Sequence, residues 1–127
     1  MDKSSVRLDV EADNRDLSIL RSVAAAMAAR ADLTLEQLDD ARLAVDEAAA
    51  YLISKCLPGD RVFVEFTSRQ QELQVCVSAP ANGSSEVARD TFGWTVLAAL
   101  ATHADASVSD SYATITMSFV RHAPVGA

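Results

Sequence analysis

Three segments of the chain alternate apolar and polar residues, and this alternation constrains the fold more than any other feature of the sequence. Apolar side chains occupy every second position in 62–66, 73–77 and 113–119. A period of two places these side chains on one face of a β-strand. Residues 6–10 and 106–110 predict two further, shorter strands. Because each strand has one apolar face, we predict a largely antiparallel sheet, covered on one face and partly wet on the other.

Helical patterns separate these strands. Residues 14–30 are rich in alanine, which favours a helix with Asn14 as its N-cap. A second helix is predicted over 34–56, because it opens with the capping-box spacing "TLEQ" and ends at "LPGD". A third, short helix is predicted over 91–104, after a polar loop of a length that is often functional or mobile. The order of elements predicts an α+β fold, a two-layer sandwich with three helices on one face of the sheet.

Composition places the chain among ordinary globular domains. Its 127 residues suit a single domain over 1–127, with flexible ends at about 1–5 and 121–127. The net charge of −7 and the lack of a basic stripe argue against a direct nucleic-acid partner. The polar N-terminus predicts no signal peptide, and no apolar run approaches the ~20 residues of a membrane span. We therefore expect a cytoplasmic protein without a membrane segment.

Metal and redox chemistry have weak support in the sequence. Cys56 and Cys76 have no metal-like spacing, so no metal site is expected. Both thiols are expected to be reduced in the cytosol. Whether either has a redox role is left open by the sequence.

The second helix carries acidic residues beside an apolar stripe. The stripe follows spacings of three and four and predicts the core face: Leu38, Ala41, Val45, Ala48 and Leu52. Asp39, Arg42 and Asp46 lie on another line, where they can pair at i, i+3 and i, i+4. We interpret Asp46 as part of this solvated, charged face.

Glu47 is less easily explained. It lies one turn before Tyr51, and the alanines near it leave room for something else to bind. The alternative is a half-exposed glutamate that lies near Tyr51 or Lys55 and has no further role.

The run "LDDARLAVDEAAAYLI" resembles the N-box helix of GHKL ATPases, which have a histidine-kinase-like ATPase fold. It is most similar to the anti-sigma-factor kinases of the RsbW and SpoIIAB type, and among them to the UsfX-like branch. "RLAVDE" and "FGWTVLAALA" are the most specific parts, and the resemblance covers nearly the whole chain. It implies a nucleotide site for ATP and Mg²⁺, in which Glu47 would be the catalytic base.

Several positions depart from the pattern that the resemblance implies. The N-box asparagine, which would hold magnesium, falls on Tyr51, and a phenol is a poorer magnesium ligand than an amide or carboxylate oxygen. The aspartate that would accept the adenine amino group falls near Ala79, followed by Gly83 as the remaining glycine of its box. The last glycine box keeps Gly93 and Thr95 but no further glycines, which makes a weak phosphate cradle. These positions are the candidate nucleotide-binding residues, in a site whose motifs look degenerate.

The resemblance implies protein partners as well. Arg21 matches an arginine on the first helix of the family that contacts both sigma and anti-anti-sigma partners. We therefore expect an anti-sigma factor that sequesters an alternative sigma factor of the stress-response or sporulation type and is countered by an anti-anti-sigma (STAS) protein. A homodimer that uses the first strand and helix is also expected. The alternatives are an active ATP-dependent serine/threonine kinase that phosphorylates the anti-anti-sigma protein, and a scaffold module with neither partner.

Overall fold

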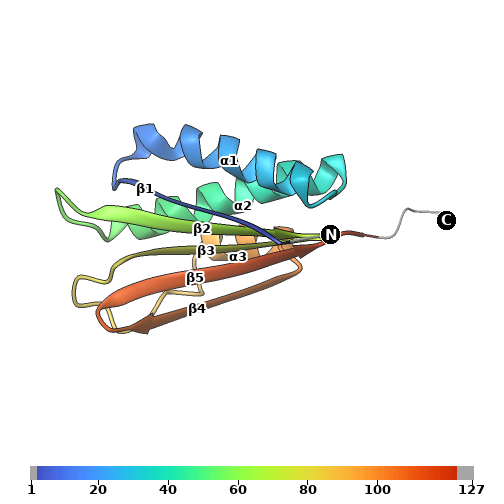
Figure 1. Cartoon of the computed structure of the whole chain (residues 1–127). Helices are drawn as coiled ribbons and strands as arrows, with labels where there is room; N and C mark the ends of the chain where they lie inside the picture. The colour runs from blue at the N-terminus through green and yellow to red at the C-terminus, as the bar shows by residue number, and fades with distance from the viewer. Residues whose placement is uncertain (1–2, 123–127) are drawn as a thin grey trace.

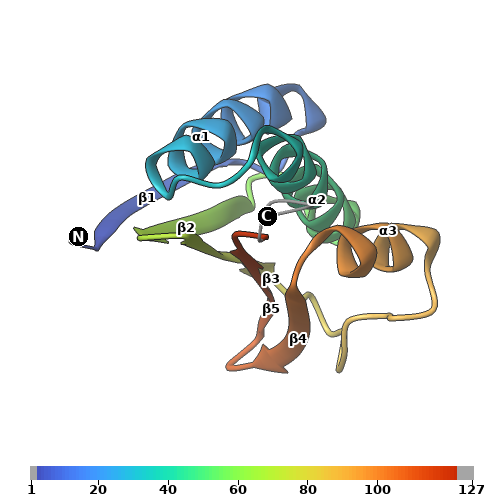
Figure 2. The same cartoon turned by 90° about the vertical axis from the view of Figure 1, so that its right-hand side faces the viewer.

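The computed structural model describes residues 3–122 and forms two layers, a sheet and a layer of helices (Figures 1 and 2). The elements in chain order are β1 (Ser4–Glu11), the 3-10 turn η1 (Asn14–Asp16), α1 (Leu17–Arg30), α2 (Leu35–Ser54), β2 (Arg61–Arg69), β3 (Glu72–Pro80), α3 (Phe92–Leu100), β4 (His103–Ser109) and β5 (Tyr112–Val120). The predicted α+β sandwich is confirmed.

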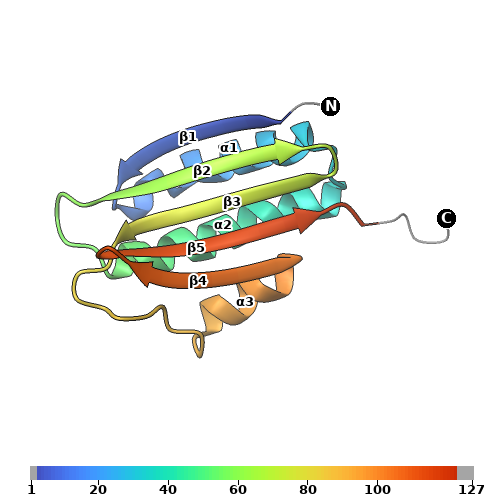
Figure 3. The same ribbon diagram turned by 60° about the horizontal axis from the view of Figure 1, so that its bottom comes forward.

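The five strands form one antiparallel sheet in the order β1-β2-β3-β5-β4 (Figure 3). Inward and outward positions alternate along β2, β3 and β5, as the sequence predicts. Val64 of β2 lies opposite Val77 of β3, and Val77 lies opposite Ile115 of β5, so their side chains form one buried row. Polar side chains such as Thr116 occupy the open face.

All three helices cover the same face of the sheet, and α2 contacts both α1 and α3 (Figure 2). The position of α2 follows from its composition, because small alanines let neighbouring helices and strands approach it closely. Ala41, Ala44, Ala48 and Ala49 are all fully buried. The helix therefore holds the centre of the core, and its remaining positions face α1, α3 or solvent.

Two predicted boundaries are wrong. The cap at the start of the first helical segment is Asp13, whose carboxylate accepts from the Arg15 N–H at 3.0 Å, and Asn14 is the first residue of η1. His103 and Ala104, predicted as helix, begin β4, because they pair with Ser118 and Met117 of β5. Pairing between strands overrides the local helical pattern there.

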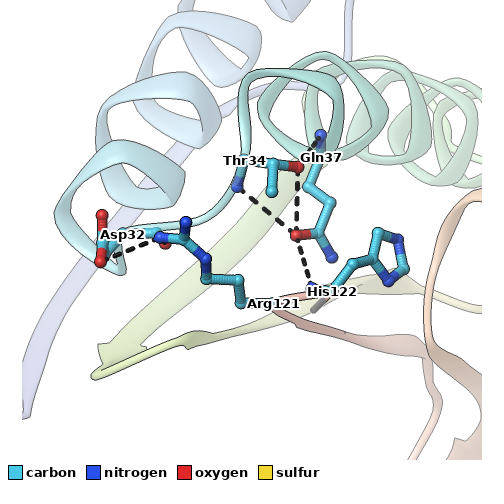
Figure 4. Close-up of polar contacts among 5 residues, drawn as sticks. All are labelled: Asp32, Thr34, Gln37, Arg121 and His122. Carbon is cyan, nitrogen blue, oxygen red and sulfur yellow. Dashed lines mark hydrogen bonds and ion pairs between the residues drawn. The ribbon is translucent and has the colours of Figure 1, made fainter. Parts of the chain in front are cut away.

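Gln37 joins the end of β5 to the start of α2. It is 2% exposed, and its Nε2 donates to the Val120 carbonyl at 2.7 Å. Its Oε1 accepts from the His122 N–H at 3.2 Å and faces Thr34 in the predicted capping box (Figure 4). The start of α2 is therefore tied to a strand more than eighty residues further along the chain.

The ends of the described chain are fastened in place. Arg121 donates to the Asp32 carbonyl at 2.7 Å and pairs with its carboxylate at 3.0 Å (Figure 4). Ser4 and Ser5 pair with β2. These contacts lie within the predicted flexible ends, about 1–5 and 121–127, whose flexibility stays a prediction. Residues 1–2 and 123–127 lie outside the described chain.

Candidate functional site

The carboxylate of Glu47 lies against the first turn of α3. A Cβ atom added to Gly93 would lie only 2.9 Å from Glu47 Oε1, so the helix backbone passes directly beside the carboxylate. Thr91 caps the helix by accepting from the Trp94 N–H at 3.1 Å. Because unpaired N–H groups make a helix N-terminus partly positive, Glu47 stabilises the start of α3. Gly93 permits this close approach.

Tyr51, one turn further along α2, faces the loop between β3 and α3. Its hydroxyl accepts from the Ala88 N–H at 3.0 Å. The Lys55 Nζ atom lies over the Tyr51 ring, 5.7 Å from its centroid. The tyrosine that the sequence places beside Glu47 therefore binds the middle of this loop, residues 81–91.

The beginning of the loop is fastened to the end of α2. Asn82 Nδ2 donates to the Lys55 carbonyl at 2.8 Å and to the Asp60 carboxylate at 3.0 Å. The hydrogen bond from the Leu57 N–H is the main cause that lowers the pKa of Asp60, and the bond from Asn82 is the second. Both groups donate to the charged form of the carboxylate. Gly83 follows in a turn with φ of +89°, a conformation that suits glycine.

The far end of the loop is fastened to β4. Arg89 donates to the Asp105 carboxylate and to the Ala106 carbonyl, both at 2.8 Å. Its guanidinium also lies over the Trp94 ring, 5.0 Å from the centroid. The hydrogen bond from Arg89 is the main cause that lowers the pKa of Asp105. A loop of this length is often mobile, yet this one is attached at three points.

The other predicted nucleotide residues have structural surroundings. Ala79 is fully buried on the helix-covered face of β3, opposite Ala113 of β5. Thr95 is exposed, and its hydroxyl donates to the Thr91 carbonyl at 3.1 Å within α3. Glu47, Tyr51 and Gly93 gather where α2, α3 and the loop meet, whereas Ala79 belongs to the core.

Arg21 of α1 pairs with Asp46 of α2 at 2.7 Å, and the two side chains are 37% and 29% exposed. The interpretation of Asp46 as a residue of a solvated face is therefore wrong, because it bridges two helices. Arg42 pairs with Asp39 instead, at 3.6 Å.

The two cysteines lie apart from this region. Burial is the main cause that raises the pKa of both the Cys56 and the Cys76 thiols, which disfavours the reactive thiolate. Among residues 3–122, no cluster of three or more His, Cys, Asp or Glu side chains could hold a metal ion. No helix in this part of the chain is long and apolar enough to cross a membrane.

Residues 10–119 match the family described as the histidine kinase-like ATPase domain. The chain belongs to this family. Anti-sigma-F factor RsbW from two strains of Mycobacterium tuberculosis is 36% identical over 97 residues, which are 76% of this chain and 58% of the relative. The chain thus spans a little over half the length of these curated relatives. The expected resemblance to the RsbW type is confirmed.

The fold of this histidine kinase-like domain is also found in a solved structure. The RsbU and RsbW domains of Rv1364c from Mycobacterium tuberculosis match with a TM-score of 0.70 and 13% identity. The match covers 95% of this chain and 33% of that one. At this identity the match shows the fold alone.

The family name implies a site for ATP, and ATP is bound with magnesium. The residues of this domain do not fit an ATP–magnesium complex. The hydroxyl of Tyr51, at the position where a magnesium-binding amide is expected, already accepts from a backbone N–H. Ala79 offers no acceptor for an adenine amino group and is fully buried. The Glu47 carboxylate packs against Gly93 at the start of α3. The first two features lack interactions that the family resemblance implies for a bound nucleotide, and the third places the carboxylate against a helix backbone.

Sequence reasoning missed the contacts that fix the loop. Ala88 takes part through its backbone N–H, which leaves no mark in residue type. Arg89 and Asn82 are a charged and a polar residue in a polar loop, where solvated side chains are common. A signal was present only for Tyr51, from its spacing to Glu47.

Proposed function

We propose that the chain is an anti-sigma factor that sequesters an alternative sigma factor of the stress-response or sporulation type. The similarity to anti-sigma-F factor RsbW, within a match to the histidine kinase-like family over residues 10–119, carries this proposal. An anti-anti-sigma protein of the STAS type would compete for an overlapping surface and release the sigma factor. The protein would act in the cytoplasm as a homodimer built on β1 and α1.

Arg21 is the residue proposed to contact the partner. Asp46 already holds the Arg21 guanidinium at 2.7 Å. The side chain therefore has less conformational freedom to lose when a partner binds. Since the arginine is still 37% exposed, its remaining N–H donors can reach a carboxylate on another protein. Arginine is one of the residue types enriched among those that dominate binding energy at protein interfaces.

The test is calorimetric titration of the purified chain with candidate alternative sigma subunits, one at a time. We expect one of them to bind with a Kd of about 1 μM or below, which corresponds to roughly −8 kcal/mol. Arg21→Ala should weaken that binding about tenfold or more, as for a residue that contributes ~1.4 kcal/mol or more.

The matched control is Arg42→Ala. Arg42 is also a helical arginine paired with an aspartate, and its side chain is 47% exposed. Its removal should leave the affinity unchanged. If none of the sigma subunits binds, the proposed function is wrong. If Arg21→Ala and Arg42→Ala weaken binding equally, the role proposed for Arg21 is wrong.

The competing function is an ATP-dependent serine/threonine kinase that acts on the anti-anti-sigma protein. Its support is the half-buried carboxylate of Glu47 at the start of α3. Incubation of the chain with labelled ATP, magnesium and a STAS protein should give no phosphate transfer. Transfer that is lost in Glu47→Ala would establish the kinase instead.

A further inference from the structure

The middle of the loop over residues 81–91 turns inward and packs on the domain. Val87 is 6% exposed and belongs to the hydrophobic core, and Ala88 beside it is half-buried. A backbone N–H in such surroundings needs a partner, because leaving it unpaired costs free energy. Tyr51 supplies that partner from α2, at 3.0 Å.

The loop is thereby closed by the chain itself. Asn82 attaches its beginning to the end of α2, Tyr51 attaches its middle, and Arg89 attaches its end to β4. The first and third contacts are made by exposed polar side chains of the loop. The second is made by a half-buried residue of a long helix, so it has the most rigid support.

Tyr51 also lies one helical turn from Glu47, on the side of α2 that faces α3 and the loop. A ligand that bound between Glu47 and the loop would have to displace the phenol and leave the Ala88 N–H to find another partner. A phenol hydroxyl is a poorer magnesium ligand than an amide or carboxylate oxygen. The tyrosine therefore works against a phosphate-bound metal ion at this position.

We propose that Tyr51 is an internal latch that holds the loop over residues 81–91 closed on α2, in the place of a nucleotide. The three contacts that hold the loop are all made by the chain's own residues, so we expect the closed conformation not to respond to ATP. This inference goes beyond the proposed function, because it concerns the isolated chain and holds whether or not a sigma factor is the partner.

The latch is tested by hydrogen exchange at the Ala88 amide in the wild-type chain and in Tyr51→Phe. Phenylalanine keeps the ring and removes only the hydroxyl acceptor. A hydrogen bond of this kind is worth ~0.5–1.5 kcal/mol net, so the amide should exchange about 2- to 10-fold faster in the variant. Tyr112→Phe is the matched control, because Tyr112 is the other tyrosine and lies at the start of β5 against Phe63. In Tyr112→Phe, the Ala88 amide should exchange at the same rate as in the wild type.

A second measurement adds ATP with magnesium to the wild-type chain. Trp94 is the only tryptophan and lies under Arg89 of the loop, so its fluorescence reports on this region. We expect neither the fluorescence nor the Ala88 exchange to change. Unaltered Ala88 exchange in Tyr51→Phe would overturn the latch. Slower Ala88 exchange on addition of ATP to the wild type would overturn the claim that Tyr51 takes the place of a nucleotide. Neither result depends on sigma binding, so the failure of the proposed function remains distinguishable.

Discussion

Replacing Gln37 by alanine should destabilise the fold by about 2–3 kcal/mol. The Nε2 bond to the Val120 carbonyl is worth ~1 kcal/mol net, and the acceptor shared by Thr34 and His122 is worth a similar amount. One buried methylene adds ~0.8 kcal/mol. We do not add the full penalty for a stranded acceptor, because Val120 is an exposed residue at the end of β5 and we expect water to replace the lost donor in the variant. The loss is still a sizeable part of the ~5–15 kcal/mol that stabilises a domain.

Urea unfolding measures this loss, with circular dichroism and the fluorescence of Trp94 as two independent probes. Coincident transitions would justify a two-state treatment of the free energy of unfolding. Gln74→Ala is the matched control, because Gln74 is an exposed glutamine on β3. It should change stability by less than ~0.5 kcal/mol. If Gln37→Ala were as mild as the control, the join between β5 and α2 would contribute nothing, and our reasoning about it would be wrong.

Two further predictions concern the candidate site. Gly93→Ala should destabilise the wild type more than it destabilises a Glu47→Ala background. The expected difference is the ~0.5–1.5 kcal/mol needed to turn the carboxylate off its rotamer. Equal effects on the free energy of unfolding in both backgrounds would refute the close contact. The pKa of Asp105 is held below its ordinary value of 3.8, so its hold on the loop is complete above that value and is lost as the pH falls through the lower, folded pKa. Acid titration should therefore change Trp94 emission only below pH 3.8, and Asp105→Asn should abolish this step; a midpoint well above 3.8 would contradict the assignment.

Much of the fold could be predicted from local patterns. The alternation around Val64, Val75 and Ile115 depends only on neighbouring residues, and so does the capping box that begins with Thr34. The N-cap at Asn14 was predicted wrongly because Asp13 beside it is an equally good acceptor, and residue type does not separate two adjacent caps. Where long-range pairing decides the structure, as in the first residues of β4, local patterns cannot reveal it.

The candidate site could be predicted only in part. The spacing of Glu47 and Tyr51 places them on one side of a helix, which the structure confirms through their contacts with Gly93 and Ala88. What the two side chains face could not be predicted, because it depends on how the loop returns to α2. The pairing of Arg21 with Asp46 joins two helices and likewise has no local signal. The roles proposed for these residues in partner or nucleotide chemistry stay predictions.

The position of β1 at the sheet edge has a consequence for biosynthesis. Its nearest partner positions, Glu11 and Arg61, are 50 residues apart, because 61 − 11 = 50. At a translation rate of ~5–20 residues per second, the strand waits about 3–10 s for its partner to be synthesised. During that wait, its charged residues Arg7, Asp9 and Glu11 discourage pairing with strands of other nascent chains. The helices α1 and α2 are synthesised during that wait and can pack on each other through local contacts, so β1 pairs with β2 only after two of the helices that cover the sheet have been made.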